Sequence, residues 1–143
     1  MLKIGDFGIS KIDIKEMSKQ FTTTMGSHSS PAYIAPEVLK NKASTTKVDM
    51  WAIGIILYQL VSSSNLPFES ENFFGLIEAI KENDPPPVQT SLSTFIKEAI
   101  KALLDKNPEN RPDASTLLNK DEMKIHISKV ISLFSSSTDR VGL

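Results

Sequence analysis

The feature that most constrains the fold is an apolar stretch of 14 residues, VDMWAIGIILYQLV, which runs from Val48 to Val61. It is apolar on nearly every face of a helix, and such a helix is stable in water only when other elements cover it. It contains Asp49 and Gln59 and is shorter than the roughly 20 residues that a membrane-spanning helix needs. We therefore expect a buried central helix with the rest of a soluble domain packed around it, and no membrane contact.

Four other segments have the pattern of shorter helices that could cover the central one. They are residues 72–81, 93–106, 114–120 and about 122–134. The second, STFIKEAIKALLDK, repeats its apolar side chains at helical spacing and so forms one apolar stripe. Asp113 is expected to cap the third segment. Strand is expected only at Leu2–Ile4 and in a few residues after Gly8, so the chain is predicted to be mainly α.

The charge balance and the absence of cysteine exclude several classes of function. The 143 residues carry 16 basic and 17 acidic side chains, and a net charge of −1 gives no basic surface for nucleic acid or an anionic membrane. Without cysteine there are no disulfides and no thiolate zinc sites, which suits a reducing compartment. We expect a cytoplasmic or nuclear protein whose partners are neither nucleic acid nor membrane.

The stretch between Gly8 and Pro36 departs from the helical pattern. It has little periodicity and many hydroxyl side chains. A loop of more than about 15 residues in a compact domain is usually functional or disordered, and this stretch is longer than that. Just before it, Asp6 stands in the turn GDFG, where a carboxylate could hold Mg²⁺ or could cap the turn. The stretch is therefore a candidate functional loop.

Four segments, in this order and spacing, resemble those of the protein kinase family. LKIGDFGISK resembles its magnesium-binding strand and turn, and SPAYIAPE resembles its substrate-docking loop and the Ala-Pro-Glu that follows. KVDMWAIGIILYQLVSSSNLPF looks like its central buried helix, and LLDKNPENRPDASTLL looks like the segment with its structural arginine, here Arg111. The resemblance covers about residues 2–120 and best fits serine/threonine kinases of the NIMA-related or calcium/calmodulin-kinase-like kind.

The resemblance implies metal and structural roles for particular residues. Asp6 would hold Mg²⁺, and the adjoining Phe7 and Gly8 would complete its turn, with Phe7 packed against the nucleotide lobe or in the core. Glu37 and Arg111 would form a buried ion pair, and the alternative is two separate solvated charges.

Two more structural residues follow from the same resemblance. Pro36 belongs to the Ala-Pro-Glu that ends the loop. Asp49 would anchor the family's catalytic loop, or would be only an acidic residue in the first turn of its helix.

The resemblance also makes the stretch between Gly8 and Pro36 an activation segment, of which residues 21–34 would gate the site. Its candidate phosphorylation sites, which could equally be part of a solvated loop, are Thr22, Thr23 and Thr24. Ser30, Pro31 and Tyr33 would form the substrate-docking loop, with the Ser30 hydroxyl helping to position the substrate hydroxyl. The family usually has Gly-Thr-Pro where this chain has Ser29-Ser30-Pro31, and an alternative register uses Gly26-Ser27.

Kinase parts that precede Asp-Phe-Gly in the family do not occur in these 143 residues: the Gly-rich loop, the strand lysine with its helix glutamate, and the His-Arg-Asp catalytic loop. The resemblance therefore implies an incomplete C-terminal (large) lobe without the N-lobe. Residues 1–134 would be a partial kinase domain and residues 135–143 a polar flexible tail. ATP and Mg²⁺ would be cofactors of the intact kinase, and this chain alone, lacking the catalytic base, is expected to bind neither tightly.

Two functions stay open at this point. The first is a protein serine/threonine kinase, of which this chain is a part that is inactive alone and that needs the N-terminal kinase half, in cis or in trans, to act on a protein substrate. The second is a non-catalytic, kinase-like module that binds proteins through its helical surface.

Overall fold

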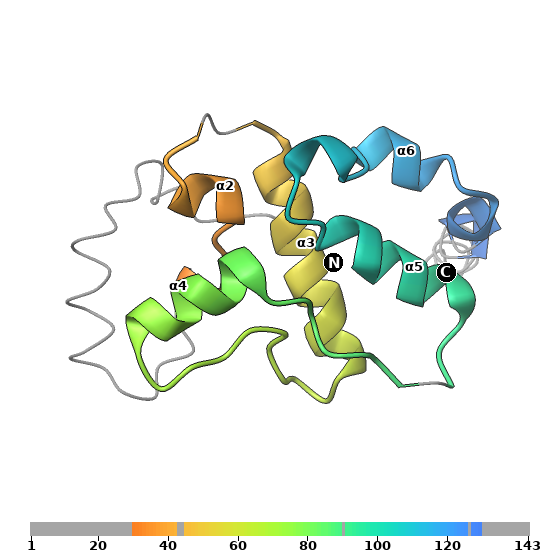
Figure 1. The fold of residues 1–143 in the computed structure, drawn as a ribbon. Coiled ribbons are helices and arrows are strands. Elements are labelled where there is room, and N and C mark those ends of the chain that lie inside the picture. The colour runs from red at the N-terminus through yellow and green to blue at the C-terminus, as the bar shows by residue number, and fades with distance from the viewer. Residues whose placement is uncertain (1–29, 43–44, 90, 126, 130–143) are drawn as a thin grey trace, which may run out of the picture.

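The computed structural model describes residues 30–42, 45–89, 91–125 and 127–129. In chain order its elements are the 3₁₀ turn η1 (Ser30–Tyr33), the helices α2 (Pro36–Leu39), α3 (Lys47–Val61), α4 (Phe73–Glu82) and α5 (Thr94–Leu103), the 3₁₀ turn η2 (Pro108–Asn110) and the helix α6 (Ala114–Leu118). Residues 121–125 and 127–129 are helical too. The described ranges contain no strand, in agreement with a mainly α chain (Figure 1). The strand expected at Leu2–Ile4 and the tail 135–143 lie outside them.

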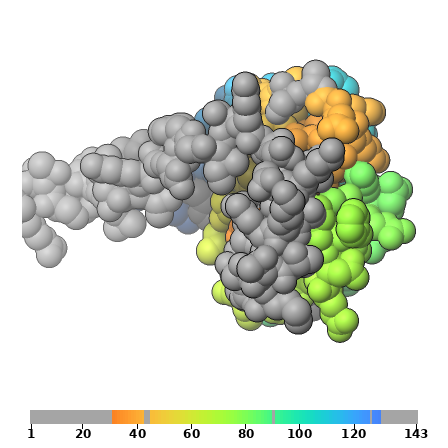
Figure 2. Space-filling view, turned by 90° about the vertical axis from the view of Figure 1, so that its left-hand side faces the viewer, coloured from red at the N-terminus to blue at the C-terminus, as the bar shows by residue number. Residues whose placement is uncertain are grey.

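Helix α3 is the central element, as its apolar sequence predicts. It runs through the middle of the molecule, with α2 and α4 on one side and α5 and α6 on the other (Figure 1). It packs against α5, η1 and η2, while α2 packs against α4. Figure 2 shows that last pair as neighbouring orange and green surfaces on one flank. Trp51 and Ile55 are completely buried in the resulting core.

The helices α4, α5 and α6 begin at side-chain caps. Asn72 accepts a hydrogen bond from the Gly75 N–H at the start of α4, and Ser93 accepts one from the Ile96 N–H at the start of α5. Asp113 caps α6 by accepting from the Thr116 N–H at 2.7 Å, as the sequence predicts. The bonds from Thr116 and Ser115 lower the pKa of the Asp113 carboxyl to about 2.

Helix α5 ends at Leu103, before the expected boundary at Lys106. The reason is local: the Asp105 carboxylate accepts a hydrogen bond from the Asn107 N–H at 2.8 Å and another from the Asn110 side chain at 3.2 Å. These bonds favour a turn over a further helical turn, because a short acidic side chain competes for backbone N–H groups.

The closest contact between α3 and α5 occurs at Gly54. A Cβ atom at this position would lie 2.8 Å from the Leu103 Cβ and 2.8 Å from a Leu104 methyl carbon. Only a residue without a side chain allows this approach, so the helix tolerates a glycine that costs it about 1 kcal/mol in propensity.

One face of α3 is not covered, as expected of a helix that is apolar on all faces in a chain with only a few amphipathic helices to cover it. Ile53, Ile56 and Leu60 lie on this face and are exposed. Their spacing of three and four residues puts them in one row along the helix. We call these three residues the apolar stripe. No helix in the described ranges has the length and apolar character that crossing a membrane requires.

Candidate functional site

The expected docking loop is held against the core by its own backbone and by Tyr33. Pro31, Ala32 and Ile34 are buried, and the Ile34 N–H donates to the Pro31 carbonyl at 3.1 Å. The Tyr33 hydroxyl donates to the Gln59 side-chain oxygen of α3 at 2.8 Å. Gln59 of the central helix therefore holds the loop in place.

Glu37 and Arg111 form the buried ion pair that the sequence predicts. Pro36 begins α2, and Glu37 lies in its first turn, where a carboxylate interacts favourably with the helix dipole. One guanidinium nitrogen of Arg111 donates to Glu37 Oε1 at 2.9 Å and the other donates to Oε2. The two residues are only 3% and 1% exposed. This two-point geometry is the strong form of an arginine–carboxylate contact.

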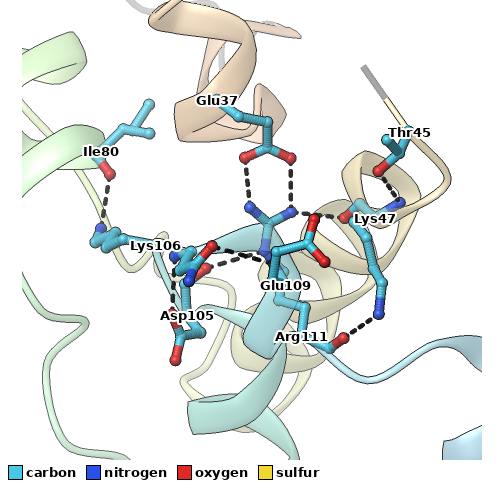
Figure 3. Close-up of polar contacts among 9 residues, drawn as sticks. Glu37, Thr45, Lys47, Ile80, Asp105, Lys106, Glu109 and Arg111 are labelled. Carbon is cyan, nitrogen blue, oxygen red and sulfur yellow. Dashed lines mark hydrogen bonds and ion pairs between the residues drawn. The ribbon is translucent and has the colours of Figure 1, made fainter. Parts of the chain in front are cut away.

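Arg111 also contacts two other parts of the chain, the turn after α5 and the first half of α3 (Figure 3). Its Nε donates to the Asp105 carbonyl at 2.9 Å, and Nη1 donates to the Lys47 carbonyl in the first turn of α3 at 2.6 Å. Lys47 Nζ donates back to the Arg111 carbonyl. The guanidinium carbon lies 5.3 Å from the centre of the Trp51 ring. With these partners every nitrogen of the buried guanidinium donates a hydrogen bond, which offsets the cost of burying the charge.

Lys106 is a second cation with partners from other elements, and no sequence pattern indicates this role. Its Nζ donates to the Ile80 carbonyl near the end of α4 at 2.7 Å (Figure 3). The same ammonium lies 4.0 Å from the Phe68 ring centre and 5.1 Å from that of Trp51, two rings that stack on each other. Burial lowers the pKa of Lys106 to about 8, although Asp84 and Glu82 act in the opposite direction.

Asp49 occupies the first turn of α3 and is exposed. Within the described ranges its carboxylate has no hydrogen bond or ion pair. Its place in the first turn is one where a carboxylate interacts favourably with the helix dipole, and its anchoring of a catalytic loop stays a prediction.

The remaining predicted site residues lie outside the described residues: Asp6, Phe7, Gly8, Thr22, Thr23 and Thr24. Ser30 is described only as the first residue of η1. In the described ranges, no group of three or more histidine, cysteine, aspartate or glutamate side chains could hold a metal ion. In the described residues, the expected docking loop is therefore attached to the core. The predicted magnesium ligand, Asp6, is not tested.

Comparison with known proteins gives the same assignment for most of the chain. The protein kinase domain family matches residues 1–122. Serine/threonine-protein kinase Nek4 of Mus musculus is 29% identical over 140 residues, which is 98% of this chain and 17% of that protein. G2-specific protein kinase nim-1 of Neurospora crassa is 36% identical over 118 residues, 82% of this chain and 13% of that protein. G2-specific protein kinase nimA of Emericella nidulans is 32% identical over 124 residues, 87% of this chain and 17% of that protein. The chain thus spans less than a fifth of each of these three relatives.

Proposed function

The chain belongs to the protein kinase family, with NIMA-related kinases among its relatives, and from this premise we propose that its function is ATP-dependent phosphoryl transfer to serine or threonine hydroxyls of proteins. Its own contribution is the part of the large lobe that docks the protein substrate. We place the protein in the cytoplasm or the nucleus, since a chain without cysteine suits a reducing compartment.

The observation that carries this proposal is the buried contact between Glu37 and Arg111. It joins α2, directly after the expected docking loop, to the segment that follows α5, across 74 positions of the chain. A substrate loop needs a rigid support, because small displacements of a positioning element are costly in catalysis. The Tyr33–Gln59 hydrogen bond supplies a second attachment of the same loop, to α3.

In the intact kinase we propose ATP and Mg²⁺ as cofactors, with Asp6 as a metal ligand in a turn shared with Phe7 and Gly8. The metal would neutralise charge on the transferred phosphoryl group. Ser30 and Pro31 would position the substrate hydroxyl, and phosphorylation of Thr22, Thr23 or Thr24 would add charge to the gating segment.

We propose that the 143 residues are inactive when alone. They contain no His-Arg-Asp sequence, and the family uses the aspartate of that motif to orient the attacking hydroxyl. The apolar stripe on α3 supports the need for further kinase parts, in cis or in trans, because it leaves part of a core helix in water.

A chimera tests this proposal. Residues 1–122 of this chain replace the matching segment in the kinase domain of the Neurospora crassa relative, which supplies the remaining kinase parts. Transfer of radiolabelled phosphate from ATP to casein is then measured for the chimera, for its Asp6→Ala variant and for the 143-residue chain. We expect activity in the chimera only, because the Asp6→Ala variant loses the proposed metal ligand.

A chimera that unfolds cooperatively but transfers no phosphate would contradict the kinase proposal. That result would favour the second function, a non-catalytic module that binds proteins, for which the exposed apolar stripe provides a contact surface. Activity in the 143-residue chain that Asp6→Ala removes would contradict the proposal that it is inactive alone.

A further inference from the structure

A groove of about 490 Å³ lies on the side of α5 that faces the proline-rich loop. One wall is residues 84–88, which follow α4, and the other is α5 from Lys97 onward with the turn after it. This volume is within the range of pockets that hold small organic molecules, about 300–1,000 Å³. It lies apart from the docking loop and from the Glu37–Arg111 pair, since none of those residues lines it.

The groove is apolar at its base and stiff along one wall. Ile100 and Leu104 line it and are buried in the core, and Val88 is half-buried beside them. The opposite wall contains Pro85, Pro86 and Pro87, whose rings fix their backbone φ angles. A stiff wall lowers the ordering cost of binding, because less freedom is lost when a ligand enters.

Most of the charged side chains around the groove already have partners. The Asp105 carboxylate accepts from Asn107 and Asn110, and the Lys106 ammonium donates to the Ile80 carbonyl. Asp84 is the exception among them: it is exposed and its carboxylate has no hydrogen bond or ion pair within the described ranges, although its charge favours the protonated form of Lys106 and so raises the pKa of that lysine. Lys97 has an interaction of its own.

Lys101 also differs from the groups that have partners. It lines the groove from the last turn of α5 and is exposed. Across the ranges that the structure describes, its ammonium has neither a hydrogen bond nor an ion pair. The groove therefore combines an apolar base with one cation that is available to a ligand.

We propose that this groove binds a small apolar carboxylic acid, whose ring or alkyl body covers Ile100, Leu104 and the proline wall and whose carboxylate pairs with Lys101. The apolar body supplies most of the affinity, because burying apolar area is favourable and non-directional. The carboxylate supplies the preference for an acid, about two- to fivefold, which is typical of an exposed ion pair. The proposal does not depend on kinase activity.

Three probes with one ring system but different charge test the proposal on the full 143-residue chain. They are 2-naphthoate, 2-naphthylmethanol and 2-naphthylmethylamine, and binding is followed by ¹H–¹⁵N chemical shifts. We expect the acid to bind most tightly, the alcohol about two- to fivefold more weakly and the amine most weakly. The shifts should concentrate at Val88, Ile100 and Leu104.

Variants of Lys101 make the test specific. Lys101→Gln should remove the preference for the acid over the alcohol, and Lys101→Glu should reverse the order of the acid and the amine. Lys120→Gln, which changes an exposed lysine outside the groove, should alter nothing. Equal affinity for the acid and the alcohol would overturn the proposal, as would shifts that concentrate at the apolar stripe or an acid preference that survives in Lys101→Gln.

Discussion

The two faces of α3 carry side chains of the same kind in different surroundings. On one face, Trp51 and Ile55 are fully buried, and Gly54 lets α5 approach to within van der Waals contact. On the other face, the apolar stripe of Ile53, Ile56 and Leu60 is exposed. Ile55 and Ile56 are chain neighbours, yet their exposed fractions are 0% and 50%. The stability that an apolar residue adds to this chain therefore depends on which face it occupies.

The covered face also has the buried charges. The guanidinium of Arg111 and the ammonium of Lys106 both lie near the Trp51 ring, at 5.3 Å and 5.1 Å. Both cations belong to the segment after α5 and donate to backbone carbonyls: Arg111 connects this segment to α3, and Lys106 connects it to α4. The two faces of α3 thus differ in whether their side chains have packing and hydrogen-bonding partners. Four experiments follow from this difference.

The largest expected effect is the loss of the buried ion pair. Arg111→Met should lower the free energy of unfolding by about 3–5 kcal/mol, since Glu37 is left as an unpaired buried charge. Urea unfolding midpoints measure this change, and adding Glu37→Gln should restore part of the loss. The matched control is the surface pair of Lys40 and Glu82 at 3.7 Å, where Lys40→Met should cost less than about 1 kcal/mol. Similar losses in both variants would contradict the distinction between buried and surface charge.

The neighbouring isoleucines give the next largest effect. Ile55→Ala should cost about 2–5 kcal/mol, because it leaves a cavity in the core. Ile56→Ala, the same chemical change one residue later, should stay within about 0.5 kcal/mol. Both are measured by urea unfolding, and their helix propensities change equally. Equal losses would show that the exposed face is covered in solution.

Deprotonation of Lys106 should make a smaller contribution, which appears as a pH dependence of the free energy of unfolding. Its pKa is about 8 in the folded chain and 10.5 in an ordinary environment. Between these two pH values the unfolded chain holds the proton and the folded chain does not, so stability should rise with pH from about 8 to 10.5. The side chain is half-buried, so solvent reduces the effect below that of Ile55→Ala.

The effect of Lys106 is measured as the difference in unfolding free energy between the parent chain and the Lys106→Met variant. The unfolding free energy of the parent chain, relative to that of Lys106→Met, should increase across this pH range. A difference that stays flat, or that falls, would mean that the lysine keeps its proton in the folded chain.

The smallest effect on stability is expected at the apolar stripe. Replacing Ile53 and Ile56 by serine should change the urea midpoint less than Ile55→Ala does, because the two residues are already 45% and 50% exposed. The same double variant should bind less Nile red, a neutral dye that fluoresces on apolar surfaces. If dye binding is unchanged, the stripe is not the accessible apolar surface of this chain.

Local sequence signals were enough to predict most of the helices. The run from Val48 to Val61 indicated α3, and Asp113 marked the start of α6, because caps and apolar runs act within a few residues. The contact of Glu37 with Arg111 could be expected only from the kinase resemblance, since no local rule joins residues 74 positions apart.

Other features had no local signal. Val48 to Val61 is apolar all round, so its pattern could not show which face α5 would cover. Lys106 binds the Ile80 carbonyl, and every residue has a carbonyl, so the sequence did not identify this partner. The end of α5 was missed because the bonds of the Asp105 side chain override the helical pattern. The predicted metal ligand Asp6 stays a prediction, because it lies outside the described residues.

The long loop closed by Glu37 and Arg111 has a consequence for how the chain folds. The contact encloses α3, α4 and α5, so it can form only when these helices are already close to their final positions. Bringing together ends that are so far apart costs entropy that helix formation alone does not repay. We therefore expect the pair to form late in folding. Its loss should accelerate unfolding far more than it slows refolding, so the pair acts chiefly on the lifetime of the folded state.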